Sequence, residues 1–287
     1  MATLKQIRQR IKTARNIQQI TRAMKLVAAA RLKKATDRVF QARPYSEKLK
    51  ALMQSMSSAG ELPSHPLMEK RPVKKLCLIL ITAERGLAGS YNTNLLRTAG
   101  DYLKGLECDK CLLTVGKKGN VFFGKRGYEV VHNVTVPSAG SRLEDAIEVT
   151  RTARELYESG EVDAVDICYS KFYSPIRQTP QIVQLLPIEP PQAEGDGGEG
   201  NAAYLFEPDP ETLLATLLPR YFQGLIWQAM LESTASEHGA RMSAMTSATD
   251  NAGKMINSLT LKANRERQAV ITTQILEVVS GAEALKN

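Results

Sequence analysis

The strongest constraint in this sequence is the long, unbroken helical pattern at each end. Residues 3–58 contain no glycine and one proline, Pro44. Apolar residues recur there at spacings of three and four, which is typical of an amphipathic helix. These positions are Ile7, Ile11, Ala14, Ile17, Ile20, Met24, Val27, Leu32, Ala35, Val39 and Ala42. We expect Pro44 to kink this helix or to divide it in two.

The C-terminal segment has the same character. No proline follows Pro219, where we expect a kink, and residues 220–280 predict a helix roughly 90 Å long. A helix of that length cannot stay covered against a small domain, and only the N-terminal helix offers a partner of similar length. The sequence therefore predicts an antiparallel coiled coil of residues 1–58 with residues 208–287.

Between these helices the pattern changes to short apolar runs that alternate with helical segments. Residues 73–189 predict an inserted three-layer, Rossmann-like α/β domain with a mainly parallel sheet. Its last helix should begin at the N-cap Ser141, with Glu144 closing a capping box. Residues 190–207 are rich in glycine and acidic residues at their start and predict a flexible loop and linker.

The positive charge of the chain is concentrated at its N-terminus. The net charge is +8, and residues 1–50 hold fourteen Lys and Arg against Asp37 and Glu47 alone. Such a helix can be a solvated face, or it can bind nucleic acid, an anionic membrane or an acidic protein. Nucleic-acid binders usually interleave aromatic residues, and only Phe40 and Tyr45 occur here. An acidic protein partner is favoured.

The location of the chain follows from what the sequence lacks. The first thirty residues are too charged for a signal peptide, and no run approaches the ~18 apolar residues that a membrane span requires. We therefore expect an intracellular protein whose four cysteines, Cys77, Cys108, Cys111 and Cys168, are reduced thiols.

One segment is a single residue short of a phosphate-binding loop. In GNVFFGKR, Gly119, Gly124 and Lys125 match the pattern G-x-x-x-x-G-K-[ST], but Arg126 replaces the hydroxyl that would bind magnesium. The intervening residues 121–123 are apolar and are expected to form the buried side of a short helix. Ordinary packing is the favoured interpretation.

Two further patterns give little support for a cofactor or metal site. ERGLAGS, residues 84–90, is only part of a dinucleotide fingerprint and is better explained as a tight turn after a strand. Cys108-x-x-Cys111 lacks further ligands at zinc spacing. No catalytic, cofactor-binding or metal-binding residue is predicted.

Several segments together resemble the gamma subunit of F-type ATP synthase over nearly the whole chain. They are IRQRIKTARNIQQITRAMKLVAAARLKKA, RPYSEKL, ERGLAGSYNTNL, YLFEPDP, SEHGARMSAMTSATDNAGKMI and RQAVITTQILEVVSGAEAL. The resemblance implies a central rotor shaft without an active site of its own. It implies a coiled coil inside a hexamer of alpha and beta subunits. It also implies that the α/β domain forms a foot that contacts the epsilon subunit and the ring of c subunits. The rotor would couple proton flow to nucleotide exchange.

The resemblance also implies partner-binding residues. Met24, with Arg22 and Lys25, matches the place where the shaft passes acidic loops of the beta subunit. Arg267 and Gln268 match a pair that grips a beta-subunit loop, and Arg241 matches a further contact. Gln274 stands where the family often has a carboxylate. Tyr204, in YLFEPDP, matches a segment near the c ring, although Asp209 could simply cap a helix.

The loop ERGLAGS departs from the commoner D-R-G-L-C-G-G at Glu84, Ala88 and Ser90, which rotation should tolerate. The sequence alone leaves two other functions open. A basic coiled-coil nucleic-acid binder would show steeply salt-dependent DNA affinity. A nucleotide-dependent enzyme would bind ATP as an isolated chain.

Overall fold

The computed structural model describes residues 3–58, 63–189 and 209–284. The chain packs as two units, one formed by residues 1–27 with 242–287 and the other by residues 28–241. Two long helices, α1 (Leu4–Ser58) and α5 (Pro210–Ala284), each run through both units.

Both long helices contain a proline, and neither ends at it. Pro44 lies inside α1 and Pro219 inside α5, so Pro44 does not divide the N-terminal helix in two, and the alternative of a kink there stays a prediction. A proline removes one backbone hydrogen bond, and the long flanking helical pattern outweighs that loss. The start of α5 follows its cap, because the Asp209 carboxylate accepts a hydrogen bond of 2.8 Å from the Thr212 N–H. The predicted N-cap is confirmed.

In the first unit α1 and α5 pair in opposite directions. Thr249 donates a hydrogen bond of 2.9 Å to the Thr21 hydroxyl, and further along α5 Gly253 lies against Gln18, which is earlier in α1. Among the described residues of this unit, the buried apolar ones are Ile7, Ala14, Met245 and Ala252. The small side chains at the contact let the two helices approach closely. The predicted antiparallel pairing is confirmed.

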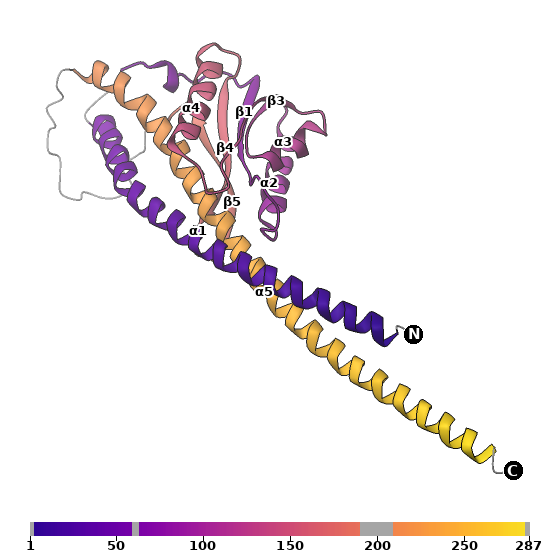
Figure 1. The fold of residues 1–287 in the computed structure, drawn as a ribbon. Coiled ribbons are helices and arrows are strands. Elements are labelled where there is room, and N and C mark those ends of the chain that lie inside the picture. The colour runs from indigo at the N-terminus through magenta and orange to yellow at the C-terminus, as the bar shows by residue number, and fades with distance from the viewer. Residues whose placement is uncertain (1–2, 59–62, 190–208, 285–287) are drawn as a thin grey trace. The chain divides into compact units, whose positions relative to one another are not determined.

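The second unit contains a five-stranded sheet in the order β3-β2-β1-β4-β5 (Figure 1). The first four strands are parallel, and β5 is antiparallel to β4. This agrees with the predicted mainly parallel sheet. The strands are β1 (Lys75–Ile81), β2 (Asp109–Val115), β3 (Glu129–Val134), β4 (Ala164–Phe172) and β5 (Gln178–Leu186).

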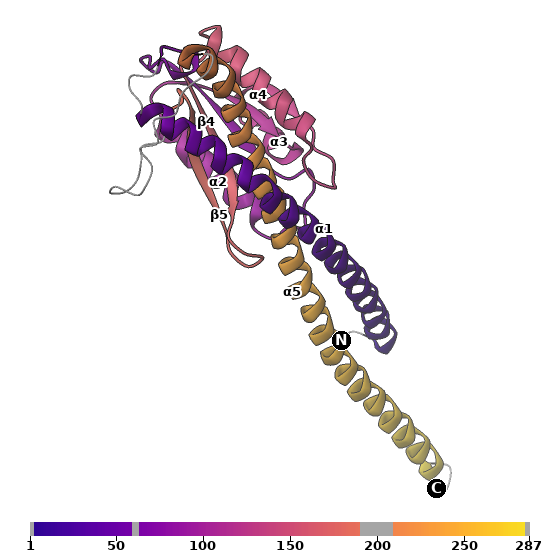
Figure 2. The ribbon, with the colours of Figure 1, turned by 90° about the vertical axis from the view of Figure 1, so that its left-hand side faces the viewer.

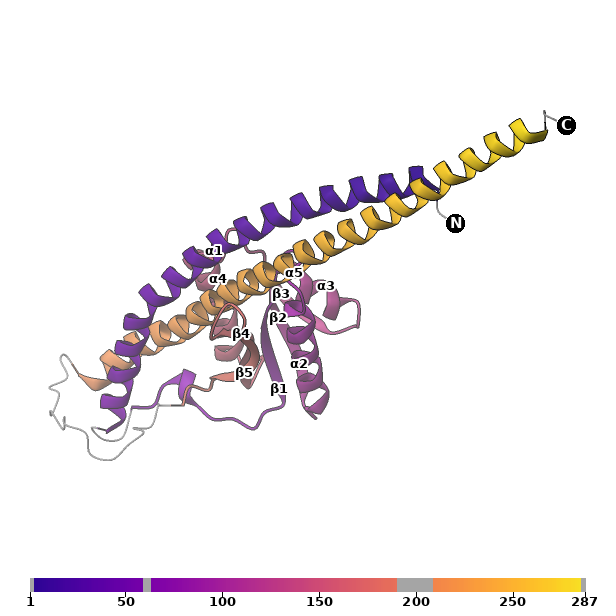
Figure 3. The ribbon, with the colours of Figure 1, turned by 90° about the horizontal axis from the view of Figure 1, so that it is seen from below.

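Helices cover both faces of this sheet, which gives the predicted three layers. One face packs on α2 (Tyr91–Gly105) and α3 (Lys117–Gly124). The other packs on α4 (Leu143–Glu158), on α5 residues from Leu214 to Met230, and on Met53 and Met56 of α1. Within this unit α1 crosses α5 (Figure 2), and the sheet lies on the α5 side of the pair (Figure 3).

The predicted cap of α4 is shifted by one residue. The N-cap is Arg142, whose backbone N–H donates a 2.8 Å hydrogen bond to the Asp145 carboxylate. The Ser141 hydroxyl is 3.2 Å from that of Thr234 in α5. Because this tertiary contact holds Ser141, the capping box uses Arg142 and Asp145 instead of Ser141 and Glu144.

The domain boundaries proposed from the sequence, at 1–58, 73–189, 190–207 and 208–287, stay a prediction. The whole 190–207 segment lies outside the described residues, and the packing units above divide the long helices elsewhere. Within the described ranges, none of the helices is both long enough and apolar enough to cross a membrane.

Candidate functional site

The order of the strands marks the place where a ligand would bind in a doubly wound fold. The chain order reverses between β1 and β4, and ligands of open α/β sheets bind beyond the carboxyl ends of the strands at such a point. Here α5 is hydrogen-bonded to the carboxyl half of β4. The Ser170 N–H donates to the Ser233 hydroxyl at 3.2 Å, and the Ser236 hydroxyl donates to the Ser170 carbonyl at 3.0 Å.

Residues that follow β1, β3 and β4 also contact this part of α5, residues 233–241. After β1, the Tyr91 hydroxyl donates to the Ser233 carbonyl at 3.2 Å. After β3, Gly140 lies so close to Thr234 that a Cβ on the glycine would be 2.8 Å from the threonine methyl. After β4, Gly239 lies against Pro175. The helix therefore occupies the crevice that a nucleotide would need, and its small side chains permit this close approach.

The segment that resembles a phosphate-binding loop is a helix, as its apolar residues predicted. Residues 117–124 form α3, and the Gly119 N–H donates to the Thr82 hydroxyl at 2.9 Å instead of facing a free anion site. Phe123 is buried, but Val121 is exposed, so the buried side of this helix is narrower than predicted. Its first turn serves packing against β1.

These two observations predict that the isolated chain does not bind Mg-ATP. Calorimetric titration at micromolar protein should show no binding heat, and Lys125→Ala should give the same trace as the unchanged chain. Micromolar affinity that Lys125→Ala abolishes would contradict the interpretation, because it would require an anion site at α3.

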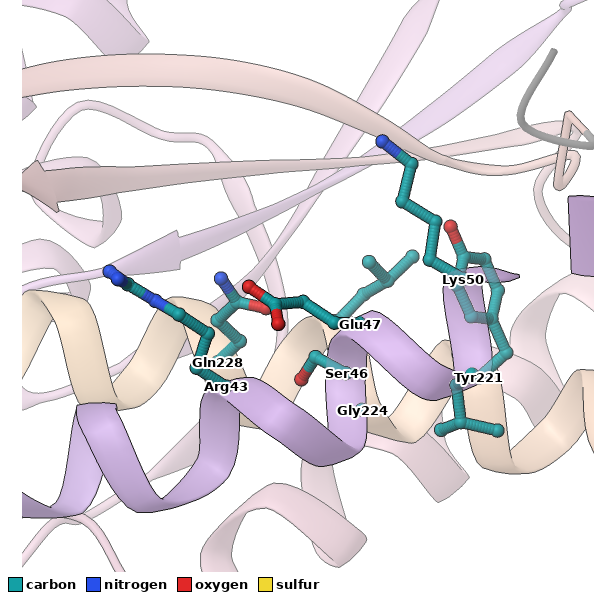
Figure 4. Close-up of a pocket in the computed structure, with 9 residues that line it drawn as sticks. Arg43, Ser46, Glu47, Lys50, Tyr221, Gly224 and Gln228 are labelled. Atoms are coloured by element: carbon teal, nitrogen blue, oxygen red, sulfur yellow. The ribbon is translucent and has the colours of Figure 1, made fainter. Parts of the chain in front are cut away.

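A pocket of about 200 Å³ lies between α1 and α5 in the second unit (Figure 4). Small-molecule sites usually have about 300–1,000 Å³, so this pocket is small for a nucleotide. It is lined by Arg43, Ser46, Glu47, Leu49, Lys50, Tyr221, Gly224, Leu225 and Gln228. Its charged residues are exposed, and the pocket has the character of a groove between two surface helices.

The cysteines lie in the sheet domain as free thiols. Cys111 is opposite Cys77 across β1 and β2, whereas Cys108 is only half-buried before β2. Within residues 3–58, 63–189 and 209–284, no cluster of three or more His, Cys, Asp or Glu could hold a metal ion.

The most unusual surface lies in the first unit. All residues from 267 to 282 of α5 are exposed. Six of them are large apolar residues that are 46–72% exposed, namely Val270, Ile271, Ile275, Leu276, Val278 and Val279. Helix α1 leaves this end of α5 uncovered, because α1 has 55 residues and α5 has 75. Contiguous exposed apolar surface of this kind marks an interaction site.

Comparison with known proteins identifies one family over nearly the full length of the chain. The family model described as ATP synthase matches residues 3–285. The ATP synthase gamma chain of Moorella thermoacetica is 45% identical over 286 residues, with 100% of both chains covered. That of Pelotomaculum thermopropionicum is 43% identical over 286 residues, again with 100% of both chains covered.

The chain belongs to the ATP synthase gamma chain family.

Solved structures agree on the fold. A chain of the Euglena gracilis mitochondrial ATP synthase, from a structure of OSCP, F1 and the c ring, has a TM-score of 0.69 at 18% identity, covering 98% of this chain and 94% of that one. A chain from the central stalk and c ring of the Tetrahymena thermophila enzyme has a TM-score of 0.58 at 22% identity, covering 80% of this chain and 99% of that one.

The residues that the gamma family resemblance singled out fall into three groups. In the first unit, Arg22, Arg267, Gln268 and Gln274 are exposed, and Met24 and Lys25 are half-buried. No side-chain hydrogen bond or ion pair joins these six to the described part of the chain. They are accessible to another subunit.

The second group is Arg241 alone. Its side chain is only 12% exposed and lies in an ion pair of 2.7 Å with Glu237. The gamma family resemblance assigned it to a partner contact, whereas the structure places it against its own chain. The third is Tyr204, which lies outside the described residues, so its role near the c ring stays a prediction.

Sequence reasoning missed the packing role of residues 233–241. Ser233, Ser236 and His238 are buried there, and burial lowers the pKa of His238 to about 4, with a further lowering by Arg241 and Arg31. The available signal was the density of Ser, Thr, Ala and Gly in STASEHGA, which is unusual for a solvated helix. Small residues at such density indicate close contact with another backbone.

Proposed function

We propose that this gamma chain is the non-catalytic central rotor of an ATP synthase. It turns inside a hexamer of alpha and beta subunits and couples proton translocation through the membrane ring to ATP synthesis or hydrolysis. The exposed apolar end of α5, residues 267–282, carries this proposal, because a single helix with such a surface needs a surrounding protein. The filled crevice at the sheet supports the absence of a catalytic site in the chain itself.

The partners follow from membership in the gamma family and from the surfaces above. The alpha and beta subunits would surround the paired helices of the first unit. The epsilon subunit and the c ring would bind the foot, with Tyr204 near the ring. The chain would then lie on the cytoplasmic side of a bacterial inner membrane and be held there through the complex, without a membrane span of its own.

The beta-subunit contacts are assigned to the accessible residues of the first unit. Arg267 and Gln268 would grip a beta-subunit loop through several directional hydrogen bonds, which a turning shaft can break and remake. Gln274 would bind more weakly than the carboxylate that is common in the family. Arg22 and Lys25, beside Met24, would face acidic beta-subunit loops. The exposed Ile20, Leu26 and Val27 add apolar surface nearby.

Reconstitution with separately purified alpha and beta subunits tests the proposal. The unchanged chain should form a stoichiometric complex with ATPase activity, and Gln268→Leu should lower multisite turnover about tenfold, since hydrogen bonds to charged groups contribute about 1.5–3 kcal/mol. Gln274→Glu should be neutral or mildly activating. Gln41→Leu, at an exposed position of α1 outside the proposed grip, is the matched control.

Two outcomes would contradict the proposal. Full turnover of the Gln268→Leu complex, intact on gel filtration, would place the grip elsewhere. A chain that ignores alpha and beta subunits but binds DNA with a steep salt dependence would be a nucleic-acid binder instead.

A further inference from the structure

Arg241 makes three polar contacts inside the second unit. Its NH2 group is 2.7 Å from the Glu237 carboxylate and donates to the Gly86 carbonyl at 3.3 Å. Its NH1 group is 3.3 Å from His238 Nδ1, which must accept because a guanidinium only donates. Two of these partners lie on α5 and one lies on the loop after β1. Arg241 therefore joins the helix to that loop.

The loop that Arg241 holds is strained. Leu87, next to Gly86, has a φ of 62°, a left-handed conformation that residues other than glycine seldom adopt. Its side chain is exposed, so burial of the leucine does not hold it there. Such a conformation persists only when its surroundings fix it. The bond from Arg241 to Gly86 and that from Tyr91 to Ser233 are part of this constraint.

The contacts continue from this loop to the other long helix. Glu84, two residues before Gly86, accepts a hydrogen bond of 3.0 Å from the Val136 N–H in the loop after β3. In that second loop the Ser138 carbonyl accepts a 2.6 Å hydrogen bond from Arg31 of α1. A chain of contacts thus runs from α5 through the two loops at the carboxyl end of the sheet to α1.

We propose that Arg241 and Arg31 are positioning residues that lock the parts of α5 and α1 in the second unit to its sheet, so that these helices and the sheet turn together. This rests on the proposed rotor function. Arg241 then acts inside the gamma chain and affects the beta subunit only indirectly, unlike Arg267 and Gln268. A planar guanidinium suits this task, because its fixed donors set both distance and direction.

Hydrogen exchange of the isolated full-length chain tests the lock directly. Arg241→Met should speed amide exchange in residues 84–91 by about tenfold, because the strained loop loses its tether. Arg241→Lys keeps the charge but lacks the several fixed donors of a guanidinium, so it should give an intermediate exchange rate. This variant replaces Arg241→Met in the test if the methionine variant folds poorly. Arg151→Met is the matched control, since Arg151 forms an exposed i,i+4 pair with Glu155 on α4. It should leave the exchange of residues 84–91 unchanged.

The assembled membrane complex allows a second measurement, coupling efficiency, which a role in folding stability alone would not change. Arg241→Met and Arg31→Met should each lower proton pumping per ATP hydrolysed, while soluble ATPase activity stays near that of the unchanged complex. Unaltered exchange in the isolated chain, with loss of hydrolysis only after assembly, would overturn the lock and make Arg241 a partner contact. If the unchanged chain gave no coupled complex, the rotor function would fail, and the exchange data would still decide the lock.

Discussion

Replacing Gly116 with alanine is expected to lower the free energy of unfolding of the chain by about 3–5 kcal/mol. Gly116 follows β2 and caps α3, with a φ of 90°. A Cβ there would lie 2.2 Å from the Thr82 carbonyl oxygen and 2.9 Å from its carbon. Both atoms are backbone, so no side-chain rotation relieves the overlap. The end of β1 and the start of α3 would have to separate.

Urea unfolding followed by circular dichroism measures this loss. Gly100→Ala in α2 is the matched control, because a Cβ at Gly100 would meet nothing within 4 Å. Alanine in a helix interior should stabilise the chain there by about 0.5–1 kcal/mol. If Gly116→Ala unfolded at the same urea concentration as the unchanged chain, the close contact between Gly116 and Thr82 would be wrong.

Acidification from pH 7 to pH 4 is expected to cost the folded chain about 3 kcal/mol through His238 alone. Burial, aided by Arg241 and Arg31, lowers the pKa of His238 from 6.5 to about 4. Between these values the unfolded chain binds a proton that the folded chain does not. Stability therefore falls as the pH falls through this window and is fully present above pH 6.5.

The comparison with His238→Gln isolates this contribution. Glutamine keeps an acceptor for Arg241 but does not titrate, so the unchanged chain should lose about 3 kcal/mol more than the variant between pH 7 and pH 4. Glu237 lies in the same cluster, and burial raises its pKa, which acts in the opposite direction. It is present in both chains and cancels in the difference. Parallel stability curves for the two chains would refute a neutral, buried His238.

The elements of this gamma chain could be predicted from local pattern. The spacing of apolar residues in 3–58 and 220–280 predicted both long helices, and the short apolar runs predicted a mainly parallel sheet between them. These signals are local, because a helix or strand repeats its buried face every few residues. The motifs at the two ends, such as SEHGARMSAMTSATDNAGKMI, were specific enough to indicate the family and, through it, the accessible residues Arg267 and Gln268.

The tertiary structure decided which surfaces are free and which are used within the chain. The gamma family resemblance assigned both Arg241 and Arg267 to partner contacts, yet Arg241 is hydrogen-bonded to Gly86, 155 positions away, whereas Arg267 is exposed. Likewise, only the sheet order shows that Ser233 and Ser236 fill the place of a ligand. Periodicity fixes which face of a helix is buried, but the partner of a polar side chain depends on which distant loops the fold brings to it.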